Sequence, residues 1–342
     1  MDYRKMIRKT AAFCAAPLPV KALQNASRQP LILPFYHSVS DERLPHLAHV
    51  LQIRTTKAFR ADLDFLLRHF EPVGATDLIN SAAGIIPLRK PSFHLTFDDG
   101  LKEIYTVAAP ILREKGVPAT FFLNTGFIGN RNIFYRFAIS LLLERTGEIS
   151  KGTACAITAL LDRHHIRTGD LRSRLLSISW AGRDIPEKVA SLMDFSIRDY
   201  IARHPIYLDE AEIRQLLAQG FTIGAHSHDH PWFCKIPPEE QLRQVKQSAQ
   251  ILQEKFGVTS HLFSFPFSDE GVPRQFFDAL YPPRGEVELS FGISGMKEEE
   301  QPRHLHRIPM ETGIASGARL IKGEYLYYIM KMALNKNRIT RK

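Results

Sequence analysis

Short hydrophobic runs alternate with amphipathic helical segments along most of this 342-residue chain. The first unit is a buried strand over residues 31–36 and a helix over residues 56–70, in which Phe59, Leu63 and Leu66 share one face. Repetition of this order predicts parallel strands joined by right-handed crossovers. We therefore expect an α/β fold, and a barrel in preference to an open sheet.

The other predicted elements keep this rhythm on either side of a central segment. Strands are expected over residues 92–97, 119–123, 221–225, 261–265, 289–293 and 304–308, and helices over 103–115, 209–220, 239–256, 272–280 and 320–334. Thr56 is the expected N-cap of the first helix. The segment 130–206 has helical stretches near 134–146 and 170–178 without strands between them, which predicts a helical insertion on the barrel rim.

The positive charge of the chain lies at its two ends. The formal net charge is +9, but residues 1–28 carry +5 and residues 319–342 carry +6, so the rest is slightly acidic. Because the positive charge is confined to the two ends, it argues against a nucleic-acid groove across the domain, although the ends can attract anionic lipid. The predicted division is a basic segment 1–28, a barrel over 29–129 and 207–318, the insertion 130–206, and a basic C-terminal helix or tail 319–342.

The sequence contains no apolar run near the roughly 18–20 residues that span a bilayer. The apolar stretch after the basic N-terminal residues is short and is broken by Pro17 and Pro19, so we expect no cleaved signal peptide. Three widely spaced cysteines, Cys14, Cys155 and Cys234, fit a reducing compartment. We expect a cytoplasmic protein, with peripheral membrane contact through the basic ends left open.

Two adjacent carboxylates, Asp98 and Asp99, end the predicted strand over residues 92–97 and precede Gly100. Catalytic groups collect at the carboxyl ends of strands in α/β folds. Neighbouring carboxylates repel each other unless a cation or a proton separates their roles, so one can bind a metal while the other acts as a base. An exposed Asp-Gly turn is the alternative.

Three histidines follow the predicted strand over residues 221–225. His226 and His230 are four residues apart, a spacing at which two imidazoles can bind one ion. His228 alternates away from them and is expected outside the ligand set. With a carboxylate from the aspartate pair, the site has three protein ligands and an open position, the catalytic pattern of zinc-like ions.

These motifs resemble those of the polysaccharide deacetylases, the NodB-homology group or carbohydrate esterase family 4. TFDDG at residues 96–100 is similar to the first motif of that family, and HSHDHP at residues 226–231 to its H-S-x-x-H-P motif. The resemblance implies a distorted (β/α) barrel and a metal-dependent hydrolase that removes N-acetyl groups from amino sugars of a polysaccharide or glycan precursor.

The resemblance also implies roles for individual residues. Asp98 is the expected general base, and Asp99, His226 and His230 are the expected ligands of a divalent metal, most naturally zinc. The third motif of the family often reads R-x-P-Y, whereas residues 264–267 read SFPF and lack the arginine.

Two residues become candidates because of that difference. The backbone N–H of Phe267 is a candidate oxyanion donor. Arg307 is the candidate replacement for the arginine that orients Asp98, with a surface salt bridge as its alternative role.

A subgroup similar to poly-N-acetylglucosamine deacetylases carries a histidine on the first strand, in a Y-H-x-[IV] setting. YHSV at residues 36–39 matches this pattern. The resemblance therefore implies His37 as the general acid that protonates the leaving amine. His306 is the second candidate, and a purely structural role for His37 remains open.

Two other functions remain open. The same fold can act on a small amide instead of a glycan. A non-catalytic carbohydrate-binding domain is also compatible with the missing arginine, but the presence of Asp98 argues against it, because a binding domain needs no base beside its ligands.

Overall fold

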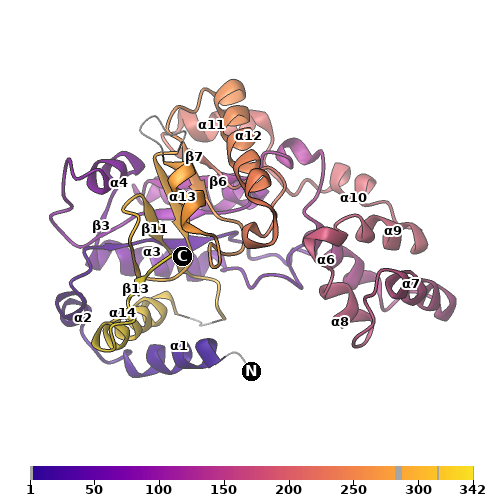
Figure 1. The fold of residues 1–342 in the computed structure, drawn as a ribbon, viewed down its shortest axis with the longest axis horizontal. Coiled ribbons are helices and arrows are strands. Elements are labelled where there is room, and N and C mark those ends of the chain that lie inside the picture. Colours follow the sequence, from indigo (N-terminus) through magenta and orange to yellow (C-terminus); the bar gives the residue numbers. More distant parts are fainter. Residues whose placement is uncertain (1–2, 282–286, 314–315, 342) are drawn as a thin grey trace.

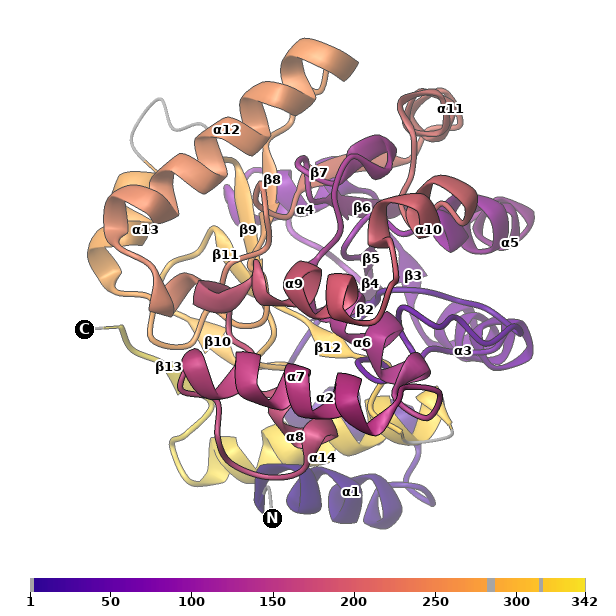
Figure 2. The ribbon, with the colours of Figure 1, turned by 90° about the vertical axis from the view of Figure 1, so that its right-hand side faces the viewer.

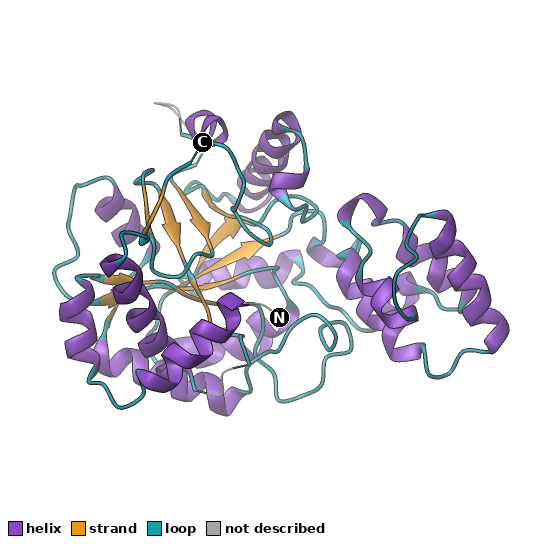
Figure 3. Ribbon diagram, turned by 60° about the horizontal axis from the view of Figure 1, so that its bottom comes forward, coloured by secondary structure: helices purple, strands orange, loops and turns teal. Residues whose placement is uncertain are grey.

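An eight-stranded sheet, parallel throughout, lies at the centre of the computed structural model, which describes residues 3–281, 287–313 and 316–341. Figure 3 shows these strands enclosed by helices. In sheet order they are β11 (His304–His306), β9 (Leu289–Gly292), β8 (Leu262–Ser264), β7 (Thr222–Ala225), β6 (Ala119–Leu123), β5 (Leu95–Phe97), β2 (Pro34–Tyr36) and β12 (Ile308–Pro309).

A single residue joins the two edges of this sheet. β11 pairs with β9 at one edge, β12 pairs with β2 at the other, and only Arg307 separates β11 from β12. A sheet whose edge strands are consecutive in the chain must curl until its edges meet. The strands therefore form a nearly closed barrel, which confirms the predicted distorted (β/α) barrel.

Two predicted strands are each divided between two sheets. Residues 31–36 form β1 (Leu31–Ile32) and β2, and residues 92–97 form β4 (Ser92–Phe93) and β5. β1 and β4 pair with each other, and β4 also pairs with β3 (Glu71–Pro72), in a separate three-stranded sheet. Hydrophobicity cannot reveal this change of sheet, because nearly every residue of both halves is buried.

The barrel helices lie close to the predicted positions. They are α3 (Thr56–His69), α5 (Ala109–Glu114), α11 (Glu210–Ala218), α12 (Pro238–Phe256) and α13 (Arg274–Leu280), with an additional α4 (Ala75–Ala82). The prediction of Thr56 as the N-cap of α3 is wrong. Thr55 has the extended backbone of a cap, and its hydroxyl accepts a hydrogen bond of 3.2 Å from the Ala58 N–H.

The helix expected over residues 103–115 opens with a π-helical turn, Ile104–Ala108, before α5. Pro110 has no N–H, and in a regular α-helix its ring would crowd the carbonyl of Thr106. A local widening of the helix at this point relieves that conflict.

Five helices form a lobe beside the barrel (Figures 1 and 2). They are α6 (Tyr135–Arg145), α7 (Lys151–Arg163), α8 (Leu171–Leu176), α9 (Ile185–Leu192) and α10 (Ile197–Arg203). Residues 130–206 are all described, and none of them forms a strand. The lobe has its own core, which includes Phe137, Leu142, Leu161 and Val189.

The two basic ends of the chain pack against each other. α1 (Tyr3–Cys14) and α2 (Val20–Ser27) lie beside α14 (Gly317–Ala333), as Figure 1 shows. Arg8 pairs with Glu324 at 3.2 Å, and Lys322 donates a hydrogen bond of 2.7 Å to the Ala16 carbonyl. Within the described residues, no helix is both long enough and apolar enough to cross a membrane.

The contact between α1 and α14 leaves no space for a side chain at Gly323. A Cβ atom there would lie 2.6 Å from the Cα of Ala12. We expect Gly323→Ala to lower the free energy of unfolding by about 1–3 kcal/mol, because the helices must separate. Urea titration followed by circular dichroism measures this change.

Gly152→Ala is the matched control, because it adds the same methyl group to α7, where the nearest atom is 3.6 Å away. Its stability should be unchanged or slightly higher, since alanine favours a helix. Equal stabilities of the two variants would contradict the close packing of α1 on α14.

Candidate active site

The candidate residues follow the carboxyl ends of parallel strands of the barrel. Asp98 and Asp99 follow β5, His226 follows β7, and His37 follows β2. Because the strands are parallel, these ends share one mouth of the barrel. Arg307 occupies the seam between β11 and β12, and its side chain reaches the same mouth.

Arg307 holds Asp98 with both arms of its guanidinium group. Nη1 lies 2.7 Å from Oδ1, and Nη2 lies 2.8 Å from Oδ2. The guanidinium also donates to the hydroxyls of Thr96 at 2.9 Å and Ser264 at 2.6 Å. The Arg307 side chain is 0% exposed, so it forms no surface salt bridge. From the seam between β11 and β12, Arg307 supplies the positive charge beside Asp98 that Ser264 cannot supply.

The environment of Asp98 keeps its carboxylate charged and oriented. Burial alone would raise its pKa, but the charge and hydrogen bonds of Arg307, together with the nearby His226 and His37, outweigh burial and lower the pKa below its usual value. The rings of Phe35 and Phe122 lie 4.4 and 5.5 Å from the guanidinium carbon. An ionised carboxylate in a fixed orientation is suited to act as a general base.

Asp99, His226 and His230 form a compact group of possible metal ligands, whose ligand atoms all lie within 4.8 Å of one another. The Nε2 atoms of His230 and His226 lie 3.2 and 3.6 Å from the Asp99 Oδ1 atom. This oxygen is buried and has no hydrogen-bond partner of suitable geometry among the described residues.

The hydrogen bond of His226 decides which ring nitrogen is free. Its Nδ1 lies 2.9 Å from the carbonyl oxygen of Ser264, and because a carbonyl can only accept, Nδ1 carries the proton. Burial lowers the pKa of His226 to about 4, so the ring is neutral near pH 7. Its Nε2 lone pair then faces the partnerless oxygen of Asp99, an arrangement that fits a cation of the zinc type between them.

The backbone around these residues adopts conformations that are rare without glycine. Asp99, Ser227, His230 and Phe267 have φ values of 71°, 68°, 59° and 57°. Such residues persist only where the surrounding structure holds them, and they gather at functional sites. The Ser227 hydroxyl contributes by accepting a hydrogen bond of 3.1 Å from the His230 N–H.

Phe267 brings both an amide and a ring to the site. Among the described residues, none accepts a hydrogen bond from its backbone N–H. Its ring lies 4.8 Å from the His230 ring, and the Phe134 ring lies 4.3 Å from the same imidazole. Phe134 immediately precedes α6, so the start of the helical lobe forms one wall of the site.

His37 pairs with a carboxylate that the sequence did not indicate. Its Nδ1 lies 2.5 Å from the Glu311 Oε2, and the backbone N–H groups of His37 and Ser38 donate to the same carboxylate at 2.9 and 3.2 Å. Burial alone would lower the pKa of His37, but Glu311 raises it to about 9. His37 therefore carries a proton at neutral pH, as a general acid must.

Glu311 is separated from His37 by 274 residues and belongs to no motif. No local signal in the sequence could have connected the two.

The prediction of His306 as an alternative acid is wrong. Side chains alternate along a strand, so His304 and His306 point away from the side on which Arg307 reaches Asp98. His306 Nε2 instead lies 3.3 Å from Glu299 Oε2. His228 lies outside the ligand group, as expected, with its Nδ1 3.0 Å from the Thr125 hydroxyl.

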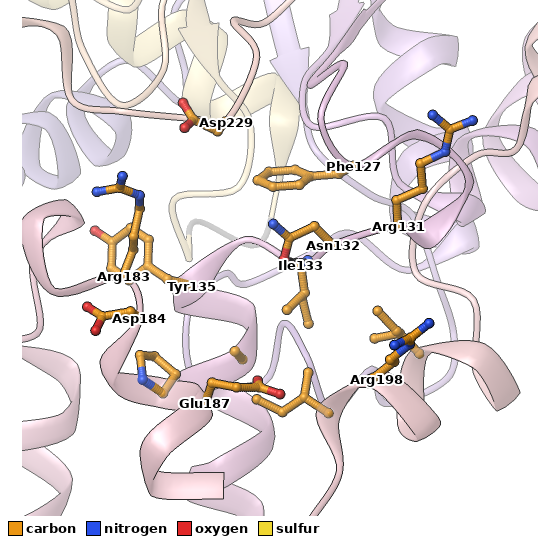
Figure 4. Close-up of a pocket in the computed structure, with 14 residues that line it drawn as sticks. Phe127, Arg131, Asn132, Ile133, Tyr135, Arg183, Asp184, Glu187, Arg198 and Asp229 are labelled. Carbon is orange, nitrogen blue, oxygen red and sulfur yellow. Dashed lines mark hydrogen bonds between the residues drawn. The ribbon is translucent and has the colours of Figure 1, made fainter. Parts of the chain in front are cut away.

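Two cavities adjoin the site. One, of about 440 Å³, lies between the barrel rim and the helical lobe and is lined by Phe127 and Asp229 on one side and by Arg183 and Arg198 on the other (Figure 4). Asp229, the residue before His230, belongs to its lining, whereas Asp99, His226 and His230 do not. The other, of about 600 Å³, is lined in part by Glu311, the partner of His37, but not by His37 itself.

Comparison with known proteins gives a family and a fold. Residues 86–276 match the family model described as polysaccharide deacetylase. A search of curated proteins finds no match to this sequence.

Three similar solved structures cover most of the chain. The Streptococcus pyogenes deacetylase PplD, in complex with acetate, is 15% identical with a TM-score of 0.53 over 86% of this chain and 97% of that one. IcaB from Ammonifex degensii is 16% identical with a TM-score of 0.54 over the same shares, 86% and 97%. A de-N-acetylase from Aggregatibacter actinomycetemcomitans is 14% identical with a TM-score of 0.50 over 83% and 95%. These likenesses show the fold.

The family match spans more than half of the chain and includes the aspartate pair, His226, His230 and Phe267. His37, Arg307 and Glu311 lie outside it. The protein thus belongs to the polysaccharide deacetylase family, hydrolases that act on the amide C–N bonds of N-acetylated sugars.

Proposed function

We propose that this protein removes N-acetyl groups from amino sugars of a polysaccharide or glycan precursor, with a divalent cation, zinc for preference, at Asp99, His226 and His230. The observation that carries the proposal is the position of Asp98. This oriented and ionised carboxylate stands directly beside three possible ligands whose spacing suits a metal, and the Nε2 atom of one of them, His226, is free to bind it. A binding domain would need no such base.

The side chains divide the reaction between them. Asp98 removes a proton from the water molecule that attacks the acetamide carbonyl carbon. The Phe267 N–H donates a hydrogen bond to the carbonyl oxygen as that oxygen gains negative charge. His37 gives its proton to the amine nitrogen as the C–N bond breaks, and acetate and a free amino sugar leave. A bound cation supplies Lewis-acid polarisation of the carbonyl and makes water more acidic.

The two cavities favour a glycan over a small amide. One is lined by Asp229, the residue before His230, and the other by Glu311, the partner of His37. Neighbouring sugar units on both sides of the reacting one would fill these spaces. Arg131, Arg183 and Arg198, which line the first cavity, offer hydrogen-bond donors for sugar hydroxyls.

The central test separates metal binding from catalysis. Asp98→Asn should keep the metal content of the wild-type protein but lose acetate release from N-acetylglucosamine oligosaccharides by about 100-fold or more, because a general base contributes about 10²–10⁴-fold. Elemental analysis of the purified protein and an enzymatic acetate assay measure the two quantities.

Asp99→Asn serves as the comparison, since it should lose both one cation per chain and activity. Undiminished acetate release by Asp98→Asn would contradict the proposed mechanism. Metal binding without release from any N-acetylated compound would instead support a binding domain, and release only from small amides would support the second alternative.

Arg307 should be required for the stability of the fold, mainly because Asp98 is buried beside it. Arg307→Met leaves a buried charge without its partner and should lower the free energy of unfolding by about 3–5 kcal/mol. The double variant Arg307→Met/Asp98→Asn should recover much of this loss, because neither charge of this buried pair remains. Urea unfolding in EDTA compares the variants without a cation. Additive effects of the two substitutions would contradict the assignment.

The Glu311 carboxylate should set the alkaline limb of activity. His37 acts in its protonated form and its pKa is raised to about 9, so kcat/KM should fall as the pH rises through that pKa. Glu311→Gln removes the negative charge, and the alkaline limb should move to lower pH by about 1–3 units.

Glu103→Gln is a suitable control, because Glu103 contacts the neighbouring Ser38 hydroxyl at 3.3 Å but not the His37 ring. A pH profile of Glu311→Gln that coincides with that of the control would rule out His37 as the acid.

A further inference from the structure

A second group of histidines and carboxylates lies on the outer side of the barrel. It consists of His304 and His306 on β11, Asp269 in the loop after β8, and Glu299 on β10 (Glu298–Glu299). The four side chains are 0, 1, 3 and 2% exposed, respectively. One ligand atom from each lies within 4.8 Å of those of the others. The proposed deacetylation uses none of them.

The distances within this group resemble those between neighbouring ligands of one ion. His304 Nε2 lies 3.2 Å from Asp269 Oδ2, and His306 Nε2 lies 3.3 Å from Glu299 Oε2. A tetrahedral ion with bonds of about 2.0 Å separates its ligand atoms by about 3.3 Å.

Hydrogen bonds from outside the group determine the proton position on His304. The Tyr281 hydroxyl donates to the Arg303 carbonyl at 2.9 Å, so its oxygen must accept from Ser290, which it also contacts. With its proton directed to Tyr281, the Ser290 oxygen accepts at 2.6 Å from His304 Nδ1. His304 therefore carries its proton on Nδ1.

The Nε2 lone pair of His304 therefore points at the buried Oδ2 atom of Asp269. This contact is repulsive unless a cation or a second ring proton lies between the two atoms. In addition, the Glu299 Oε1 atom is buried and has no hydrogen-bond partner among the described residues.

Arg341 compensates only part of the negative charge. Its Nη2 lies 2.5 Å from Asp269 Oδ2 and 2.7 Å from Glu299 Oε2. One guanidinium offsets one of the two carboxylates. Because a carboxylate oxygen can take two partners, Asp269 Oδ2 can bond to Arg341 and also bind an ion, and Glu299 keeps its partnerless Oε1 for the same ion.

We propose that His304, Asp269 and Glu299 bind a second divalent cation of the zinc type, separate from the one at Asp99, His226 and His230. His306 is an outer partner. Its Nδ1 accepts a hydrogen bond of 3.3 Å from the Ser294 N–H, so its Nε2–H donates to Glu299.

This cation supports the mouth of the barrel from outside. Asp269 comes two residues after Phe267, whose N–H is the candidate oxyanion donor, and Arg307 comes directly after His306. By tying β10, β11 and the loop after β8 together, the ion stabilises both segments.

Metal content of the full-length protein tests the proposal without reference to activity. After saturation with Zn²⁺ and removal of free ions, the wild-type protein should retain two zinc ions per chain. His304→Gln should retain one, and Asp99→Asn/His230→Gln, which leaves His226 as the one ligand of the first metal group, should also retain one. A wild-type protein with one zinc that Asp99→Asn/His230→Gln removes would overturn the proposal.

A second measurement does not depend on the folding of His304→Gln. Asp99→Asn/His230→Gln has an unaltered second group, so one equivalent of Co²⁺ should produce visible ligand-field absorption bands and raise its Tm. Absence of both changes would mean that Arg341 alone neutralises the cluster and that no cation binds there.

Discussion

The bidentate ion pair between Arg307 and Asp98 joins the closure of the barrel to its chemistry. Arg307 is the only residue between β11 and β12, which lie at opposite edges of the eight-stranded sheet, and Asp98 directly follows β5. Both side chains are buried, so neither charge is tolerable without the other. The contact that stabilises the seam also holds a carboxylate ionised where burial alone would favour its protonated form.

The same hydrogen-bonding arrangement occurs in both groups of possible metal ligands. In each case, an acceptor outside the ligand group fixes the proton of a buried histidine on Nδ1. The acceptor is the Ser264 carbonyl for His226 and the Ser290 hydroxyl for His304. The Nε2 lone pair is thereby directed at a carboxylate. Such outer partners set the tautomer and orientation of metal-binding imidazoles. The alternation of side chains along one strand puts the second group outside the barrel while Arg307 reaches inside.

Much of the fold could be predicted because it depends on short-range patterns. Hydrophobic runs and capping residues such as Asp209, whose side chain accepts from the Glu212 N–H, mark where elements begin. The division of residues 31–36 and 92–97 between two sheets could not be predicted, since both halves are hydrophobic. The π-helical turn before α5 was missed because the helical pattern over residues 103–115 does not show how the chain accommodates Pro110 in the interior of that helix.

The sequence by itself determined the barrel class and the grouping of Asp98, Asp99, His226 and His230, because these residues follow strands whose carboxyl ends must meet at one mouth. Only the tertiary structure decided that Arg307 binds Asp98, that Glu311 pairs with His37, and that His306 points outward. The physical reason is distance along the chain. These contacts join residues far apart in sequence, and they depend on which way each side chain faces once the sheet has closed.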